Sequence, residues 1–142
     1  VGINLVGLFL CAQQFGRIML EAGQGSIINV ASVLGLVGAG QIPQAGYAAS
    51  KGGVVNLTRE LAAQWARGGV RVNAICPGWF ASEMTEDMFN DEGGNRWIRR
   101  RTPMGRAGVG QELGGAAVFL ASDASSYVTG HSLPVDGGWT IV

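Results

Sequence analysis

The stretch S-I-I-N-V-A at residues 26–31 decides the fold class. It is short, apolar and rich in β-branched side chains, and this pattern predicts a strand buried on both faces, as in a parallel sheet. The stretch V-R-V-N-A-I at residues 70–75 repeats the pattern and is closed by Pro77-Gly78. Ser132–Val135, which precedes a D-G-G turn, predicts a third strand.

Helical patterns lie between these strands. Apolar spacing predicts helices at Val1 to about Leu20, Tyr47–Ala66 and Gln111–Ser122. Trp79–Gly110 is rich in glycine and charge, has weak periodicity, and is interpreted as a lid or binding loop. The alternation of helices and strands predicts an α/β protein with a doubly wound, Rossmann-like parallel sheet in one domain over residues 1–142.

Composition excludes several classes of function. Ten basic residues balance ten acidic ones, so no nucleic-acid or membrane partner is expected. The apolar run Val1–Ala12 lacks the flanks of a signal peptide and is too short to span a bilayer, and we expect a truncated chain that starts inside a helix. Cys11 and Cys76 are interpreted as reduced structural residues of a cytoplasmic protein. His131 is the single histidine and has no other metal-ligating residues at a suitable spacing, so no metal site is expected.

The pentapeptide Y-A-A-S-K at residues 47–51 carries the clearest chemical signal. Residues four apart share a helix face, so the side chains of Tyr47 and Lys51 can point into one cleft. Lys51 is the single lysine beside nine arginines. A lysine retained in such a background suggests a site where a guanidinium group would not serve.

Charge arithmetic supports a proton-transfer role for such a pair. A free tyrosine has a pKa of about 10, and bringing it to about 7 requires roughly 4 kcal/mol of preference for the phenolate. A cation about 4 Å away at an effective dielectric constant near 20 supplies on the order of 4 kcal/mol. The charge of a neighbouring lysine therefore supplies enough free energy to make a tyrosine a usable acid or base near neutral pH.

Ser32 follows the first predicted strand directly. Functional side chains gather at the carboxyl ends of strands in open parallel sheets. The Ser32 hydroxyl could donate a hydrogen bond to a substrate oxygen on which negative charge develops. Taken alone, a serine at this point is more often a turn residue.

Six motifs occur in one order along the whole chain: N-L-V-G-L-F (4–9), I-I-N-V-A-S (27–32), Y-A-A-S-K-G-G (47–53), V-R-V-N-A-I-C-P-G (70–78), F-L-A-S-D-A-S (119–125) and V-D-G-G (135–138). Together they resemble the C-terminal part of the classical short-chain dehydrogenase/reductase family. The resemblance implies a Rossmann-like fold whose first βαβ unit, with its phosphate loop, is missing from this chain. It also implies a nicotinamide cofactor, and NAD and NADP are both open.

The resemblance also assigns roles to individual residues. Tyr47 is expected to be the catalytic acid/base, and Lys51 to lower its pKa and bind the nicotinamide ribose. Ser32 is expected to position the substrate oxygen, and Asn4 to hold a water that links Lys51 to solvent. Read without the family, Asn4 is a polar residue in an apolar helix, which is more often a local backbone partner.

The nicotinamide ring is expected to lie against Pro77 and Gly78. The family commonly has a threonine five residues after that proline, where this chain has Ser82, with Thr85 slightly beyond. An apolar wall of the substrate pocket is expected from five side chains, for which ordinary packing is an equal alternative: Trp79, Phe80, Met84, Met88 and Phe89.

The expected activity is interconversion of a ketone and a secondary alcohol, on a small hydroxy, keto or gluconate-like substrate. Reduction of a 3-oxoacyl thioester on a carrier protein is the alternative substrate reading. A non-catalytic assembly module is the alternative class. The small residues of the Tyr47 helix favour close helix approach in a homo-oligomer (Ala48, Ala49, Gly52 and Gly53). Two further patterns, Gly35-x-x-Gly38-x-Gly40 and the run Arg99–Arg101, are interpreted as loop glycines and as a solvated part of the lid.

Overall fold

The computed structural model describes residues 1–41, 43–82 and 85–142. Its three strands, β1 (Gly25–Val30), β2 (Val70–Pro77) and β3 (Ser132–Val135), form one parallel sheet in the order β1-β2-β3. The strands were predicted to within two residues at each end. All three run in one direction, so their carboxyl ends meet at a single edge of the sheet.

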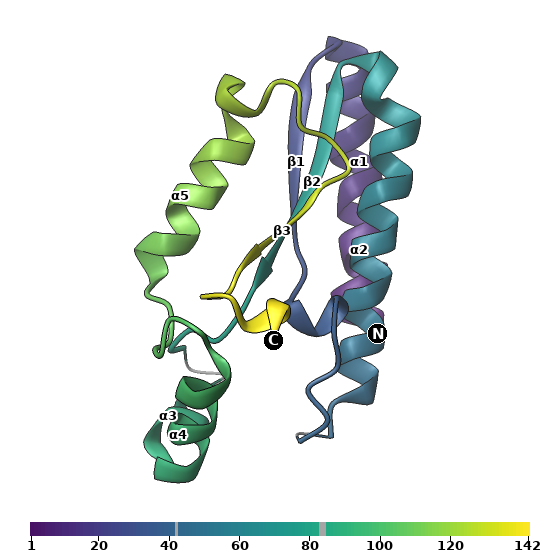
Figure 1. The fold of residues 1–142 in the computed structure, drawn as a ribbon. Coiled ribbons are helices and arrows are strands. Elements are labelled where there is room, and N and C mark those ends of the chain that lie inside the picture. Colours follow the sequence, from purple (N-terminus) through teal and green to yellow (C-terminus); the bar gives the residue numbers. More distant parts are fainter. Residues whose placement is uncertain (42, 83–84) are drawn as a thin grey trace.

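Helices cover both faces of this sheet. The helices α1 (Leu8–Ala22) and α2 (Ala45–Trp65) lie on one face, and α5 (Gly110–Ala121) lies on the other (Figure 1). Two shorter helices, α3 (Glu86–Asn90) and α4 (Glu92–Arg101), lie together at the carboxyl end of the strands (Figure 1). The predicted doubly wound α/β architecture is therefore confirmed.

The two connections between strands have opposite hands. Both step in the same direction across the sheet, because the strands are neighbours in sequence order. The first passes through α2 on one face, whereas the second includes α5 on the opposite face (Figure 1). One connection therefore departs from the right-handed rule for parallel strands. This departure is what covers the second face of the sheet.

The prediction of an irregular loop over Trp79–Gly110 was wrong, because α3 and α4 lie inside it. The Asp91 carboxylate caps α4 by accepting a hydrogen bond from the Gly94 N–H at 2.6 Å. Arginines in the last turn of α4 complement the negative end of the helix dipole. The pair Gly93-Gly94 interrupts the helical pattern in the sequence and explains why the periodicity there looked weak.

The apolar run Val1–Ala12, which was judged from the sequence to be too short to span a bilayer, is the first part of a longer helix. A π-helical segment, Gly2–Gly7, leads directly into α1, and the combined helix is long and apolar enough, by length and composition alone, to cross a membrane. Little of this apolar stretch is buried within the described residues, so their core alone does not account for its composition. Here α1 contributes Ala12 to the core, while Phe15 and Ile18 remain exposed.

The face of the sheet beneath α2 holds most of the core. Val70 and Val72 of β2 pack against Leu61 and Ala62 of α2. A second cluster, nearer the carboxyl ends of the strands, packs Ala74 and Cys76 of β2 against Val54 and Val55 of α2. Within this apolar layer, the Asn29 side chain donates a buried hydrogen bond of 2.9 Å to the Thr58 hydroxyl. This bond fixes α2 in register with β1, because a buried amide is costly to leave unpaired.

Arg71 joins the sheet to the end of α5. Its guanidinium group donates hydrogen bonds to the carbonyl oxygens of Leu120, Ser122 and Val128 and to the Ser125 hydroxyl. The carbonyl groups at the end of a helix have no partners within it, so a cation placed there satisfies them and complements the helix dipole.

Replacement of Arg71 by alanine should therefore lower the free energy of unfolding of the intact protein by about 2 kcal/mol. Arg67, which is exposed and lies four residues earlier, offers a matched control. Urea unfolding of Arg71→Ala and Arg67→Ala measures the difference. Equal stability of the two variants would contradict the role given to Arg71.

Glu112 stabilises the start of α5. It pairs with Arg106 at 2.7 Å and accepts a hydrogen bond from the Val109 N–H at 2.8 Å. These contacts, the Arg106 hydrogen bond first, lower the pKa of Glu112 from 4.5 to about 2. A carboxylate with a depressed pKa contributes its stability fully above its ordinary pKa and loses it as the pH falls toward the folded-state value.

The stability difference between the wild type and Glu112→Gln should therefore shrink as the pH falls from 4.5 to about 2. Urea unfolding at a series of pH values checks this, and a Glu112→Gln difference that is constant with pH would refute it.

Candidate active site

Ser32 lies two residues beyond β1 and is buried. Its hydroxyl oxygen accepts a hydrogen bond from the Leu34 N–H at 3.2 Å and so caps a short 3-10 turn, Val33–Gly35. A serine hydroxyl has one donor and two acceptor sites. This contact uses only an acceptor site, which leaves the O–H free to donate to a substrate oxygen.

Tyr47 and Lys51 lie on the same side of α2, in its first two turns. The Lys51 ammonium nitrogen is 5.6 Å from the centre of the Tyr47 ring. It also donates a hydrogen bond of 2.9 Å to the carbonyl oxygen of Val30, the last residue of β1. Burial lowers the pKa of Lys51. One backbone carbonyl thus anchors the ammonium group, and its two other N–H donors remain for a ligand.

Asn4 lies in the π-helical segment before α1. Its side-chain amide donates a hydrogen bond of 3.3 Å to the Ser50 hydroxyl, which in turn donates to the Tyr47 carbonyl at 2.7 Å. Asn4 and Lys51 line one open hollow between α1 and β1. The structure therefore brings Asn4 to the helix turn that carries the pair, while its role in holding a water remains a prediction. π-Helical turns are frequent at functional sites.

Pro77 ends β2, and Gly78 follows at the same edge of the sheet. The Gly78 N–H donates a hydrogen bond of 2.9 Å to the Val135 carbonyl. A β-carbon on residue 78 would lie 2.7 Å from the α-carbon of Asp136, so only glycine fits this close approach. Gly78 thereby brings the chain after β2 beside β3 and toward the cavity described next.

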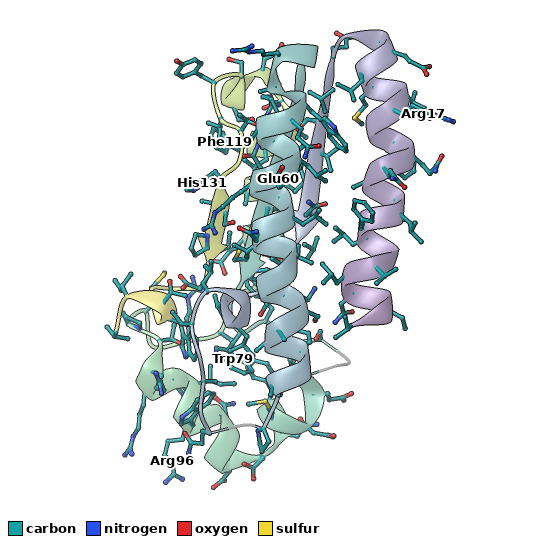
Figure 2. The ribbon with its side chains drawn as sticks, turned by 90° about the vertical axis from the view of Figure 1, so that its right-hand side faces the viewer. Arg17, Glu60, Trp79, Arg96, Phe119 and His131 are labelled. Atoms are coloured by element: carbon teal, nitrogen blue, oxygen red, sulfur yellow. The ribbon has the colours of Figure 1, made fainter. Side chains whose placement is uncertain are left out.

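A cavity of about 310 Å³ opens at the carboxyl end of the strands. It combines apolar and polar groups from four segments of the chain, and its lining residues are Ser32, Val33, Leu34, Gln44, Tyr47, Gly78, Trp79, Thr85 and Met88. Mixed linings of this kind are typical of small-molecule sites. Figure 2 shows Trp79 at the end of the molecule that carries α3 and α4, opposite Arg17 and Phe119.

The expected apolar wall is present only in part. Trp79 and Met88 line the cavity, whereas Phe80 lines a separate, smaller cavity and Phe89 packs against the core. Met84 lies outside the described residues. The equal alternative of ordinary packing thus holds for Phe89.

Thr85, rather than Ser82, faces the cavity. The Thr85 hydroxyl donates to the Phe80 carbonyl at 2.6 Å and accepts from the Ser82 N–H at 3.0 Å. Ser82 is exposed, with its hydroxyl 3.1 Å from that of Thr85. The role of Ser82 in cofactor binding remains a prediction; of these two residues, Thr85 lines the cavity, but its hydroxyl is engaged with the chain itself.

An aromatic cluster fixes α4 behind the cavity. The rings of Trp79, Trp97 and Trp139 meet edge to face, with centroids 5.4 to 6.3 Å apart. The Arg101 guanidinium lies over the rings of Trp97 and Trp139, at 5.8 and 5.3 Å. Arg101 is therefore not part of a solvated run, as the sequence suggested, but a stacked side chain that closes the cluster.

The family model described as enoyl-(acyl carrier protein) reductase matches residues 1–140. The order of motifs, the parallel sheet and the grouping of Ser32, Tyr47 and Lys51 agree with that match. The chain belongs to the classical short-chain dehydrogenase/reductase family.

Several relatives act on sugar acids or polyols. The chain is 48% identical, over 98% of its length, to a 2-dehydro-3-deoxy-D-gluconate 5-dehydrogenase of Bacillus subtilis, and it covers 54% of that protein. It is 47% identical, over 99% of its length, to a galactitol 2-dehydrogenase (L-tagatose-forming) of Cereibacter sphaeroides, of which it covers 56%. The chain thus spans about half the length of the curated relatives it matches.

A solved structure agrees closely with the fold of this short-chain dehydrogenase/reductase. The gluconate 5-dehydrogenase of Burkholderia cenocepacia, in complex with NADP and tartrate, superposes with a TM-score of 0.95 at 44% identity. The match covers 99% of this chain and 54% of that one. The three-stranded sheet and its helices therefore correspond to about half of the relative's structure.

Gln44 was missed by sequence reasoning, although it lines the cavity three residues before Tyr47. Its place in the sequence could have indicated this, because a residue just before the helix that carries the family's tyrosine must lie at the same end of the sheet as that tyrosine.

The loop glycines include one with a packing role that was not identified from the sequence. Gly35 was interpreted as a loop glycine, yet a β-carbon there would lie 2.6 Å from the Lys51 carbonyl oxygen. Gly52 and Gly53 likewise face segments of this same chain, near Gly35 and Leu5.

Replacement of Gly35 by alanine should push the 3-10 turn away from α2. Overpacking of this kind costs about 1–3 kcal/mol, and it should also lower turnover because Ser32 caps the same turn. Gly38→Ala is the control, since a β-carbon there meets no atom within 4 Å. Urea unfolding and turnover of the two variants provide the measurement, and equal behaviour would disprove the close contact.

Proposed function

We propose that the full-length protein is an NAD(P)-dependent oxidoreductase that interconverts a ketone and a secondary alcohol on a polyol or gluconate-like substrate. The observation that carries this proposal is the position of the Ser32 and Tyr47 side chains in the wall of one cavity, with the Lys51 ammonium group 5.6 Å from the Tyr47 ring. The relatives named for gluconate and galactitol support the substrate class.

The residues present fit the nicotinamide end of the cofactor. Lys51 has two free N–H donors at the end of β1 for ribose hydroxyls, and Pro77 ends β2 with Gly78 beside it in the cavity lining, where the ring is expected. The cofactor would supply or accept the hydride. NADP bound to the Burkholderia cenocepacia relative supports its assignment here, and NAD remains an alternative.

The side chains of this chain handle the oxygen and the proton. In the direction of reduction, the Ser32 hydroxyl donates a hydrogen bond to the carbonyl oxygen, and Tyr47 transfers a proton to it. Lys51 keeps positive charge beside the phenol, which stabilises the phenolate that remains. The apolar residues of the cavity exclude water and strengthen each of these interactions.

Tyr47→Phe tests this proposal directly. It should reduce turnover of the full-length protein by about 10²- to 10⁴-fold, because it removes the acid/base. Binding of the reduced cofactor, followed by its fluorescence, should persist. Tyr127→Phe is the control, since Tyr127 is fully exposed. Retained activity of Tyr47→Phe would overturn the assignment of Tyr47.

A substrate panel separates the alternatives. It contains 5-keto-D-gluconate, galactitol and acetoacetyl thioester, each monitored by the absorbance of reduced cofactor. The description of the matching family model favours including the thioester. Turnover of the thioester alone would support the carrier-protein reading. Full-length protein that binds neither NADPH nor NADH would support a non-catalytic assembly module.

We also propose that the full-length protein is a cytoplasmic homo-oligomer. Apolar side chains exposed on α1 and α5 need cover from another surface, either the remainder of a protein as long as the relatives or a second subunit, and they include Phe9, Phe15, Ile18, Val118 and Phe119. Sedimentation velocity of the full-length protein measures the oligomeric state.

A further inference from the structure

Gln44 carries a polar group that the fold itself does not use. Its side chain makes no capping hydrogen bond at the start of α2. Its backbone carbonyl does accept the Ala48 N–H at 2.9 Å, so the main chain at this position is fixed by the helix. The side-chain amide thus extends from a fixed main-chain position and makes no hydrogen bond to the described residues.

The surroundings of Gln44 favour pairing with a ligand. Four of the nine residues that line the cavity have largely apolar side chains, namely Val33, Leu34, Trp79 and Met88. An amide that loses water there without gaining a partner costs free energy, whereas a ligand hydroxyl or carboxylate restores its hydrogen bonds. The amide offers both donors and an acceptor, which suits a hydroxyl group.

The other hydroxyl groups of the cavity already have partners or a proposed task. The Thr85 hydroxyl already bonds the Phe80 carbonyl and the Ser82 N–H. In the proposed function, Ser32 and Tyr47 both serve the reacting oxygen. Trp79 also lines the cavity and its buried indole N–H has no partner, but an indole can only donate. Among the described lining residues, Gln44 is therefore the side chain that can both donate to and accept from a second substrate group, three residues before Tyr47.

We propose that Gln44 is a specificity residue, which pairs with the hydroxyl group on a carbon next to the reacting carbon. It would thereby select polyols and hydroxy acids over simple ketones. This inference rests on the proposed function, because it takes Tyr47 and Ser32 as the groups that hold the reacting oxygen.

The test uses the full-length protein, its Gln44→Met variant and a Gln41→Met control. Methionine keeps the length of the side chain and removes its hydrogen bonds. Gln41 lies three residues earlier, is exposed and does not line the cavity. The probes are 5-keto-D-gluconate and its 4-deoxy and 6-deoxy analogues, each of which lacks one hydroxyl beside the keto carbon. The readout is kcat/KM for each pair of enzyme and probe.

The wild type should lose about 10- to 100-fold in kcat/KM on one of the two deoxy analogues. Gln44→Met should lose a similar factor on the parent compound and little more on that analogue, because both changes remove the same hydrogen bond. Gln41→Met should behave as the wild type.

Two outcomes overturn the inference and are distinguishable. If Gln44→Met keeps the wild-type preference for the parent, or loses equally on the parent and both analogues, the assignment of Gln44 is wrong and the proposed function stands. If the wild type itself reduces none of the three probes with NADPH or NADH, the gluconate-like substrate class fails, and the role of Gln44 fails with it.

Discussion

The position of α2 across the end of β1 controls the geometry of the site. Asn29 holds the middle of α2 through its buried hydrogen bond to Thr58, and Lys51 holds the beginning through the Val30 carbonyl. Gly35 allows the turn after β1 to touch the α2 backbone. These contacts bring two segments into one wall, so that a hydroxyl group and a phenol from separate elements can reach a common oxygen.

The far wall of the cavity depends on aromatic packing rather than on the sheet. Trp79 follows Gly78 at the end of β2, and Trp139 comes from the C-terminal turn. Together with Trp97 and Arg101 they hold α4 in place. The rigid sheet edge therefore carries the groups assigned to chemistry, whereas a separately packed helical segment completes the enclosure.

The sequence predicted the elements whose pattern is local and failed where structure depends on distant partners. The β-branched runs predicted β1 and β2, and the Y-A-A-S-K spacing predicted that Tyr47 and Lys51 share one side of a helix. By contrast, α4 contains two adjacent glycines, and its stability comes from the Asp91 cap and the tryptophan cluster. The close contact at Gly35 was likewise not predictable, since it arises only when the turn after β1 meets the backbone of α2. The position of Gln44 just before Tyr47 was a usable signal that was not read.

The most direct test of this account is a crystal structure of the full-length protein with NADP and a keto or hydroxy acid bound. The account predicts that the Ser32 and Tyr47 hydroxyl oxygens both lie about 2.6 to 3.2 Å from one substrate oxygen, with the Lys51 ammonium on the same side of α2. A substrate oxygen bound by neither hydroxyl, or a Tyr47 side chain turned away from the cavity, would contradict it.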